Sequence, residues 1–417
     1  MNALSTKPRV LLVNSVIYLP GEGGHKRTLY LFEMMKSLGY KVTLLTSTFN
    51  HYAKRKRDIE QFRRKYPSYS NIEFIDVPAY SRNVSIKRII SEKVWTHRFI
   101  KWYKTNAQHY DIIYHNMPDI DDIIKAQPIT KKYGLKTIID VRDLRPEVFR
   151  TIIKNDLLYK ILTYPMNLKA NKAYSCADLM FAVSEEYLQR GMSANTKAID
   201  SKAVYIGSIL DKFYDGIKKH SSSILKTDDE IWITYAGTIG NTYDLHTLID
   251  VACELQKEGY NTLRFKIIGQ GPLEENLKSY AQIKGVVNVD FIGFVPYEVM
   301  AAYLSKSDFT VNSLKARASQ SIINKVADYF AAGIPILNGS LCKEMQALVD
   351  ENQLGLNFIP EDIKSLKNAI IYLLNNPEEC KKYGENAHRI AEKKFNRANS
   401  YLEIIKRIDL LHNTAIK

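Results

Sequence analysis

A lysine and a carboxylate stand three residues apart in the segment Asn324–Pro335, which reads NKVADYFAAGIP. Its apolar residues recur at helical spacing, and Gly333 is the type of residue that ends a helix before the next strand. Lys325 and Asp328 therefore project from nearly the same face at the start of that helix. A lysine beside a helix N-terminus suits a phosphate, and a carboxylate one turn later suits vicinal hydroxyls. This pattern favours a nucleotide-sugar as ligand; the alternative is an ordinary connection between two buried elements.

Glycine-rich turns offer further contacts to a phosphorylated ligand. Glycine lets the backbone approach a ligand closely, and a turn that opens a helix can present N–H groups to a diphosphate. The candidate ligand-binding residues in these turns are Gly23, Gly24 and Arg27 after the first expected strand, and Gly237, Thr238 and Gly240 after the strand at Trp232–Tyr235.

A charged cluster follows the expected strand Thr137–Asp140. Arg142 and Asp143 stand just past the end of that strand, where charges are costly to bury without a partner or a task. We expect either a catalytic role for these two residues or a structural ion pair between Asp143 and an arginine.

Short runs rich in valine, isoleucine and leucine alternate with helical patterns along the whole chain of 417 residues. This alternation is typical of parallel sheets with helices on both faces, and the length indicates more than one core. We expect an α/β protein with two doubly wound, Rossmann-like domains facing a central cleft. The expected domains are residues 1–210 and 231–390, joined by a polar linker at 211–230, with a C-terminal helix at 391–417 that returns to the first domain. The expected strands are Val10–Asn14, Val42–Thr46, Ile72–Val77, Ile112–Tyr114, Thr137–Asp140, Leu179–Val183, Ala203–Ile206, Trp232–Tyr235, Phe265–Ile268, Val289–Ile292, Phe309–Asn312, Ile334–Leu337 and Leu356–Ile359.

The chain has 59 basic and 45 acidic residues, a net charge of +14. An excess of this size favours anionic partners such as phosphorylated substrates or anionic lipid. Nucleic acid is not expected as a partner, because zinc-finger spacing, an aromatic RNA-binding motif and a basic tail are all absent from the sequence. The four cysteines are scattered, which favours a reducing compartment, and the sequence has neither a signal peptide nor a membrane-spanning run. We expect a cytoplasmic protein, soluble or peripheral on the inner face of the plasma membrane.

Three phrases of the sequence resemble those of one enzyme family. NKVADYFAAGIP resembles the donor-binding segment of retaining glycosyltransferases of family 4, in which N-K-x-x-E-Y-x-A-A-G-x-P recurs. Gly23-Gly24 followed by GYKVTLLT at 39–46 resembles the opening of that family, and VRDLRPE at 141–147 resembles a phrase of the branch that transfers N-acetylated amino sugars. The resemblance extends over nearly the whole chain. It implies the GT-B fold, a UDP-linked sugar as the donor, and catalysis without a metal ion or other cofactor.

The resemblance also implies roles for individual residues. Asp143 would orient or deprotonate the acceptor, with Arg142 near the phosphates or the acceptor, although many family members have a histidine at the position of Arg142. The arginine and lysine that commonly follow the glycine turn at Gly237 are absent, so that Lys325 would carry the phosphate charge. The remaining implied contacts are Asp328 to the ribose hydroxyls, Gly269, Phe294 and Val295 around the base, and the backbone of Gln320, Ser321 and Ile322 to the donor, where Gln320 stands in place of a customary glutamate.

Two other segments carry weaker signals. Ser85–Lys104 combines two tryptophans and several isoleucines with lysines and arginines, which suits either an anionic membrane surface or a core helix with a solvated charged face. Asp119-Ile-Asp-Asp122 resembles a metal-binding D-x-D only superficially, and we interpret it as the solvated start of a helix.

These observations predict a glycosyltransferase that moves a hexose or N-acetylhexosamine from a nucleotide-sugar to a glycan or a polyprenyl-diphosphate-linked acceptor, in surface polysaccharide or glycoconjugate synthesis. Two alternatives stay open. One is a nucleotide-sugar 2-epimerase of the same fold, and the other is a non-catalytic scaffold of this fold that binds a sugar or a lipid.

Overall fold

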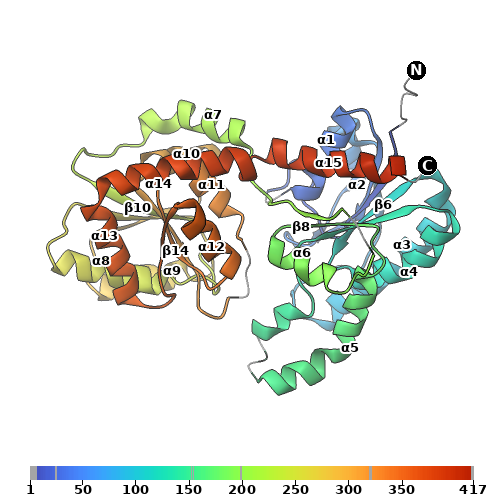
Figure 1. Ribbon diagram of the computed structural model, residues 1–417, viewed down its shortest axis with the longest axis horizontal. Coiled ribbons are helices and arrows are strands. Elements are labelled where there is room, and N and C mark those ends of the chain that lie inside the picture. Colours follow the sequence, from blue (N-terminus) through green and yellow to red (C-terminus); the bar gives the residue numbers. More distant parts are fainter. Residues whose placement is uncertain are drawn as a thin grey trace. The chain divides into compact units, whose positions relative to one another are not determined.

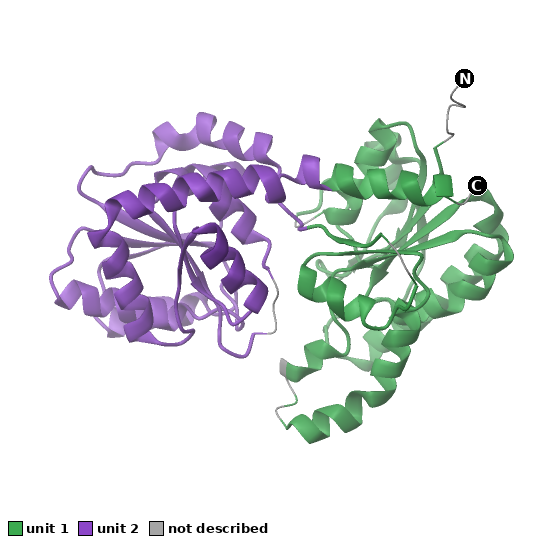
Figure 2. Cartoon of the chain, in the orientation of Figure 1, with its two compact units in different colours: residues 1–204, 401–417 green, residues 205–400 purple. Residues whose placement is uncertain are grey.

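The chain folds into two compact units (Figure 2). Unit 1 comprises residues 1–204 and 401–417, and unit 2 comprises residues 205–400. The computed structural model describes residues 7–23, 26–151, 153, 155–197, 200–318 and 322–414. The expectation of two doubly wound α/β domains is confirmed, because each unit contains one parallel sheet with helices packed against it (Figure 1).

Unit 1 is built on a seven-stranded parallel sheet in the order β5-β2-β1-β6-β7-β8-β9. Neighbouring residues of the first strand enter different cores: Val10 and Leu12 pack on one side, and Leu11 and Val13 on the other. Both faces of the sheet are therefore covered, as the uninterrupted apolar runs predict. Its strands are β1 (Arg9–Val13), β2 (Lys41–Ser47), β5 (Ile72–Ile75), β6 (Ile112–Met117), β7 (Lys136–Val141), β8 (Leu179–Ala182) and β9 (Lys202–Ala203).

The helices of unit 1 begin at residues suited to that position. The side chains of Ser85, Asn155 and Ser184 each accept a hydrogen bond from a backbone N–H in the first turn of α3, α5 and α6. The helices are α1 (Arg27–Ser37), α2 (Ile59–Lys65), α3 (Ile86–Asn106), α4 (Ile120–Lys132), α5 (Asp156–Tyr174) and α6 (Glu185–Met192), together with the part of α15 (Arg397–Thr414) from Tyr401 onward.

Unit 2 has a six-stranded parallel sheet in the order β12-β11-β10-β13-β14-β15. Two clusters of buried side chains lie against this sheet. The strands are β10 (Ile231–Ala236), β11 (Leu263–Ile268), β12 (Val289–Gly293), β13 (Phe309–Ser313), β14 (Ile336–Gly339) and β15 (Gly355–Asn357). The helices are α7 (Leu210–His220), α8 (Leu245–Lys257), α9 (Glu274–Ile283), α10 (Tyr297–Lys306), α11 (Lys325–Ala331), α12 (Lys343–Asn352), α13 (Ile363–Asn375) and α14 (Pro377–Ile390).

The expected linker at 211–230 is wrong. Most of its first half is helix α7, which packs on α10 within unit 2 and buries Phe213 completely. A Cβ at Gly216 would lie 2.7 Å from Cα of Glu298, so the two helices approach closely at this glycine. The polar residues that suggested a linker form the exposed face of this helix and the turn after it.

The C-terminal segment divides between the units. Residues Ala391–Phe395 continue α14 in unit 2, where Phe395 is buried, so the expected boundary at residue 391 falls too early. From Tyr401 onward the chain is part of unit 1, and Tyr401, Ile404 and Ile408 are buried in its core.

Each expected strand has a counterpart in one of the two sheets, whereas a short hairpin was not expected. Strand β3 (Phe49–Asn50) pairs antiparallel with β4 (Arg55–Lys56). Its second strand is charged and exposed. A pattern of buried apolar residues therefore could not predict it.

Helix α3 contains most of the segment that suggested a membrane surface. Trp95 is 4% exposed and packs in the core with Phe99 and Tyr103, and Trp102 packs against the same cluster. The two tryptophans therefore belong to a core-packing face, which is the alternative that the sequence left open. Only the first turns of α3 expose apolar side chains, at Ile86, Ile89 and Ile90.

Candidate active site

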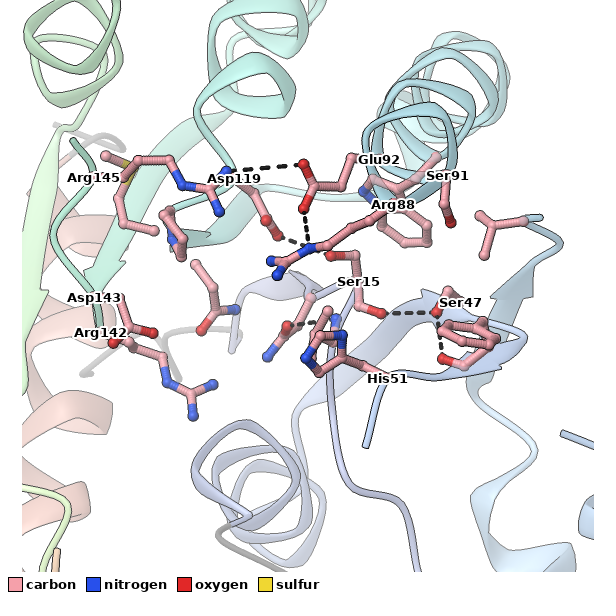
Figure 3. A pocket seen from close by; sticks show the side chains of 18 of the residues that line it. Ser15, Ser47, His51, Arg88, Ser91, Glu92, Asp119, Arg142, Asp143 and Arg145 are labelled. Carbon is pink, nitrogen blue, oxygen red and sulfur yellow. Dashed lines mark hydrogen bonds and ion pairs between the residues drawn. The ribbon is translucent and has the colours of Figure 1, made fainter. Parts of the chain in front are cut away.

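Unit 1 has a cavity of about 220 Å³ at the carboxyl ends of its strands (Figure 3). Its walls come from the segments after β1, β2, β5, β6 and β7 and from one side of α3. Strands β1 and β6 are neighbours in the sheet, and the chain runs outward from them in opposite directions. This is the switch point at which doubly wound sheets bind their ligands. Its labelled lining residues in Figure 3 are Ser15, Ser47, His51, Arg88, Ser91, Glu92, Asp119, Arg142, Asp143 and Arg145.

Arg142 and Asp143, the expected catalytic residues, both line this cavity on the segment after β7. Nη1 of Arg142 lies 3.3 Å from Oγ1 of Thr28. Partial desolvation raises the pKa of Asp143, and the positive charges of Arg142 and Arg145 oppose that shift. Among the residues that the structure describes, neither Arg142 nor Asp143 takes part in an ion pair, so the structural Asp143–arginine bridge is not formed.

A second group of charges lines the cavity from α3 and from the segments after β6 and β7. Nε of Arg88 donates to Oε1 of Glu92 at 2.8 Å, and Nη1 of Arg145 lies 3.9 Å from Oε2 of the same glutamate. Oγ of Ser15 donates to Oδ2 of Asp119 at 3.3 Å. Burial and the nearby charge of Glu92 raise the pKa of Asp119 to about 6, while Arg145 opposes the shift. The cavity thus holds an acid that titrates just below neutral pH.

The interpretation of Asp119–Asp122 as a solvated helix start is corrected by this arrangement. Helix α4 does begin at Ile120, but Asp119 lines the cavity and Asp122 is 2% exposed, where it accepts a hydrogen bond from the indole of Trp95. One signal in the sequence could have placed Asp119. It stands two residues after strand β6, Arg142 stands directly after β7, and the ends of adjacent parallel strands meet at one edge of a sheet.

His51 and Tyr80 also line the cavity, and the sequence did not identify them as site residues. Nδ1 of His51 is hydrogen-bonded to the hydroxyl of Tyr80 at the cavity wall. Burial, Lys54 and Arg88 lower the pKa of His51 to about 4, so its imidazole is neutral at physiological pH. Neither residue belongs to a recognisable motif, because both lie in irregular segments after strands β2 and β5.

Arg27 is a structural residue, and its expected role in ligand binding is wrong. Its side chain is 1% exposed and forms a two-pronged ion pair with Asp140, through Nε at 2.8 Å and Nη2 at 2.9 Å. Nη1 donates to the carbonyl of Val204 at 2.8 Å. The carboxylate of Asp140 lies within the buried sheet and requires a counter-charge there. Gly23 is exposed, with open space around its Cα, and Gly24 lies outside the described residues.

In unit 2, Lys325 begins helix α11 and lies against the glycine turn after β10. Its Nζ is 2.8 Å from the hydroxyl of Tyr235 and lies over two aromatic rings, 4.0 Å from the centroid of Tyr235 and 3.8 Å from that of Tyr243. Burial lowers the pKa of Lys325 well below its usual value. A Cβ at Gly237 would collide with this Nζ, and the φ of +156° there is one that other residues rarely adopt, so both features favour glycine at that position.

The glycine turns of unit 2 pack on each other. The N–H of Gly237 donates to the carbonyl of Ile268, and the N–H of Gly269 donates to the carbonyl of Gly293, each at 2.8 Å. Gly269 has a φ of +134°, and a Cβ there would collide with the carbonyl oxygen of Gly237. The expectation that Gly237 offers its N–H to a diphosphate is therefore wrong, because that N–H is already bonded.

The other two residues of the first turn also contact Tyr235 and Tyr243. The carbonyl of Thr238 accepts the hydroxyl hydrogen of Tyr235 at 2.7 Å, and the carbonyl of Gly240 accepts the N–H of Tyr243 at 3.1 Å. The turn and the two aromatic rings beneath Lys325 are thus held together.

Asp328 is 8% exposed, and its Oδ1 accepts hydrogen bonds from the hydroxyl of Ser208 and from that of Tyr297, the latter at 2.7 Å. Burial raises the pKa of Asp328, and these hydrogen bonds oppose the shift. An aspartate is one methylene shorter than the glutamate of the resembled motif. The hydrogen bonds of Asp328 anchor α11 to two other segments of unit 2.

The remaining donor-side candidates vary in exposure. Phe294 is 69% exposed just after β12. Val295 and Ile322 are partly buried against the second core of unit 2. Gln320 and Ser321 lie outside the described residues. Within the described ranges, no group of three or more His, Cys, Asp or Glu residues could hold a metal ion, and no helix has the length and apolar character to cross a membrane.

Comparisons with known proteins give a family match for part of the chain. Residues 216–390 match the family model described as "Glycosyl transferases group 1". The putative colanic acid biosynthesis glycosyl transferase WcaI of Escherichia coli K12 is 26% identical over 189 residues, which are 43% of this chain and 44% of that relative. The O-antigen chain mannosyltransferase C of Escherichia coli is 23% identical over 301 residues, 71% of this chain and 74% of that relative. This chain thus spans less than half the length of the first relative.

The fold is similar to that of Anabaena HepE, which was solved in complexes with UDP and with UDP-glucose. The complex with UDP superimposes with a TM-score of 0.69 at 15% identity and covers 95% of this chain and 98% of the Anabaena chain. The structural match confirms the GT-B fold expected from the sequence, and the family match lies within unit 2.

Proposed function

We propose that this protein is a retaining glycosyltransferase that moves a sugar from a UDP-linked donor to a glycan or a polyprenyl-diphosphate-linked acceptor. The two relatives named above are a colanic acid glycosyl transferase and an O-antigen mannosyltransferase, which supports a place in surface polysaccharide synthesis. The complexes of HepE with UDP and UDP-glucose support uridine as the nucleoside of the donor.

The observation that carries the donor side is the environment of Lys325. Its Nζ is surrounded by Tyr235, Tyr243 and the turn at Gly237, and no carboxylate pairs with it in the described part of unit 2. An ammonium group in such surroundings loses hydration without gaining a counter-ion. A diphosphate bound at the N-terminus of α11 would supply that counter-charge, and the helix end would favour it as well.

On this proposal the leaving diphosphate departs on the same face that the acceptor hydroxyl approaches, which retains the anomeric configuration. Lys325 and the helix end stabilise the negative charge that develops on the diphosphate. Asp143 orients or deprotonates the acceptor hydroxyl. Arg142 binds either the phosphates or the acceptor. No metal ion or other cofactor takes part.

The charge of unit 1 supports an anionic acceptor. Residues 1–204 and 401–417 contain 37 Lys and Arg against 21 Asp and Glu, a net charge of +16, whereas unit 2 has a net charge of −2. A strong positive field raises the local concentration of an anionic ligand and speeds its association. A lipid-linked diphosphate has the required charge.

The proposal is tested by titrating the protein with UDP, UMP, uridine and GDP by calorimetry and by analysing the products formed with each UDP-sugar. We expect UDP to bind most tightly and an α-configured donor to give an α-linked product. Tighter binding of GDP would overturn the choice of UDP. Isomerised UDP-sugar formed without any acceptor would identify an epimerase instead.

A further inference from the structure

Helix α5 is apolar on two opposite faces. One face is buried and includes Tyr159, Thr163, Ala170 and Ala173. On the other side, Leu157, Ile161, Tyr164 and Leu168 follow one another at intervals of four, three and four residues, which places them in one stripe along the helix. Their exposed fractions are 68%, 62%, 62% and 52%.

The exposed stripe is wider than these four residues. Leu158 and Leu162, 49% and 55% exposed, lie beside it one turn apart. Single exposed apolar side chains are normal on a protein surface, but a continuous apolar patch marks an interaction surface. Helix α5, seen at the lower edge of unit 1 in Figure 1, presents six such side chains.

Positive charges border the stripe. Helical spacing places Lys160 on one flank of the stripe and Lys169, whose Nζ lies 3.7 Å from Oδ1 of Asp121, on the other. Lys172 continues along the stripe one turn beyond Leu168. Asp156 is the only acidic residue of the helix, and it is paired with Arg150 at 2.9 Å. An apolar stripe with lysines on both flanks is the pattern of a helix that lies in the interface of an anionic membrane.

We propose that the outer face of α5 is a membrane-contact surface that lies flat in an anionic lipid leaflet. The proposal rests on the proposed function only in the choice of a lipid-linked acceptor. A second copy of this chain is the weaker occupant, because it would bring another unit of charge +16 against the same lysines. An anionic leaflet complements both the stripe and the charge.

The surface is also connected to the cavity of unit 1. The segment from Arg142 to Arg145 lines the cavity, and a short 3-10 helix at Glu147–Thr151 leads from it towards α5. Helix α5 thus begins 13 residues after Asp143, in the same unit as the expected catalytic pair.

The experiment compares three proteins in a flotation assay with vesicles of phosphatidylcholine alone or mixed with phosphatidylglycerol. The first is the wild type, and the second is the triple variant L157Q/I161Q/L168Q. The matched control is L225Q/I283Q/V287Q, which removes three apolar side chains of unit 2 that are 87%, 84% and 75% exposed. Because all six side chains are exposed, we expect all three proteins to fold with similar melting temperatures and to bind UDP equally.

We expect the wild type and the control to float with the anionic vesicles at low salt and the α5 variant to bind at least about tenfold more weakly. Added salt should weaken wild-type binding, since screening acts over about 8–10 Å. Tryptophan at position 161 (I161W) should shift its emission to the blue on vesicle addition, whereas I283W should not.

Equal flotation of the α5 variant and the wild type would overturn the proposal. So would a wild type that ignores the vesicles but forms dimers that L157Q/I161Q/L168Q abolishes, because the stripe would then be an interface between copies. Either result would leave nucleotide binding by unit 2 unaffected. Failure of the membrane surface and failure of the proposed function are therefore separate outcomes.

Discussion

Replacing Lys325 with methionine tests the donor site most directly. Methionine keeps most of the length and apolar contacts of the lysine but removes the charge that we assign to the diphosphate. Loss of a charged hydrogen bond costs about 1.5–3 kcal/mol, which corresponds to a UDP affinity roughly 10- to 150-fold weaker. Uridine has no phosphate, so its affinity should not change. Lys343→Met is a matched control, because Lys343 is likewise the first residue of a helix in unit 2 but is exposed.

The pH dependence of UDP binding gives a second readout. Burial lowers the pKa of Lys325 in the free protein, whereas a bound diphosphate favours the ammonium form and raises that pKa. Binding should therefore take up a proton between the two pKa values, and UDP affinity should fall as the pH rises through that window. Calorimetry in buffers of different ionisation enthalpy measures the proton uptake, which Lys325→Met should abolish.

The stability of the ligand-free protein should change with pH in the opposite direction. The pKa of folded Lys325 lies below that of the unfolded chain, near 10.4, so the unfolded state binds more protons in between. The free energy of unfolding of the wild type should rise with pH across this window relative to Lys325→Met. Equal weakening of UDP and uridine, with no change in proton uptake, would refute the phosphate role and leave Lys325 a structural residue.

The remaining predictions concern residues of both units and the absence of a metal requirement. Replacing Arg27 with methionine leaves Asp140 buried without its partner, so the free energy of unfolding should fall by about 3–5 kcal/mol while UDP affinity is unchanged; denaturant unfolding and calorimetry measure the two. Asp328→Ala should lower both UDP affinity and stability, by about 1.5–3 and 1–3 kcal/mol, and a loss of stability alone would remove Asp328 from the site. The raised pKa of Asp119 means that the folded state binds more protons between about pH 4 and 6. Asp119→Asn should therefore have a higher melting temperature than the wild type above pH 6. The same difference in melting temperature below pH 4, where Asp119 is protonated in both the folded and the unfolded state, would contradict this. Transfer activity should survive EDTA, and a loss restored by manganese would overturn the metal-free mechanism.

The strands could be predicted because parallel strands buried on both faces are short uninterrupted apolar runs. The segment 211–230 was misjudged for the opposite reason. Helix α7 has only one buried face, and most of its residues are polar. Its composition therefore suggested a linker, although Phe213 is buried. Helices at the surface of a sheet carry their signal in spacing rather than in average polarity.

Residues of the candidate site could be predicted where the neighbouring sequence alone defines their position. Lys325 could be placed at a helix start because the helix, its end and the following strand lie within fifteen residues. The partner of Asp140 could not be predicted, because Arg27 is 113 positions away and other arginines were equally plausible. Tyr235 and Tyr243 surround Lys325 only after β10 and α11 have come together, which no spacing in the sequence reveals.

The return of the chain to unit 1 at Tyr401 affects how the protein is made. Domains usually fold in order as the ribosome releases them. Here Tyr401, Ile404 and Ile408 belong to the core that also contains Val10 and Leu12. The core of the first unit to be synthesised therefore stays incomplete until the residues from Tyr401 to Ile408 have been translated. Unit 2 is contiguous and can fold earlier, so the order of folding during translation should be the reverse of the order of synthesis.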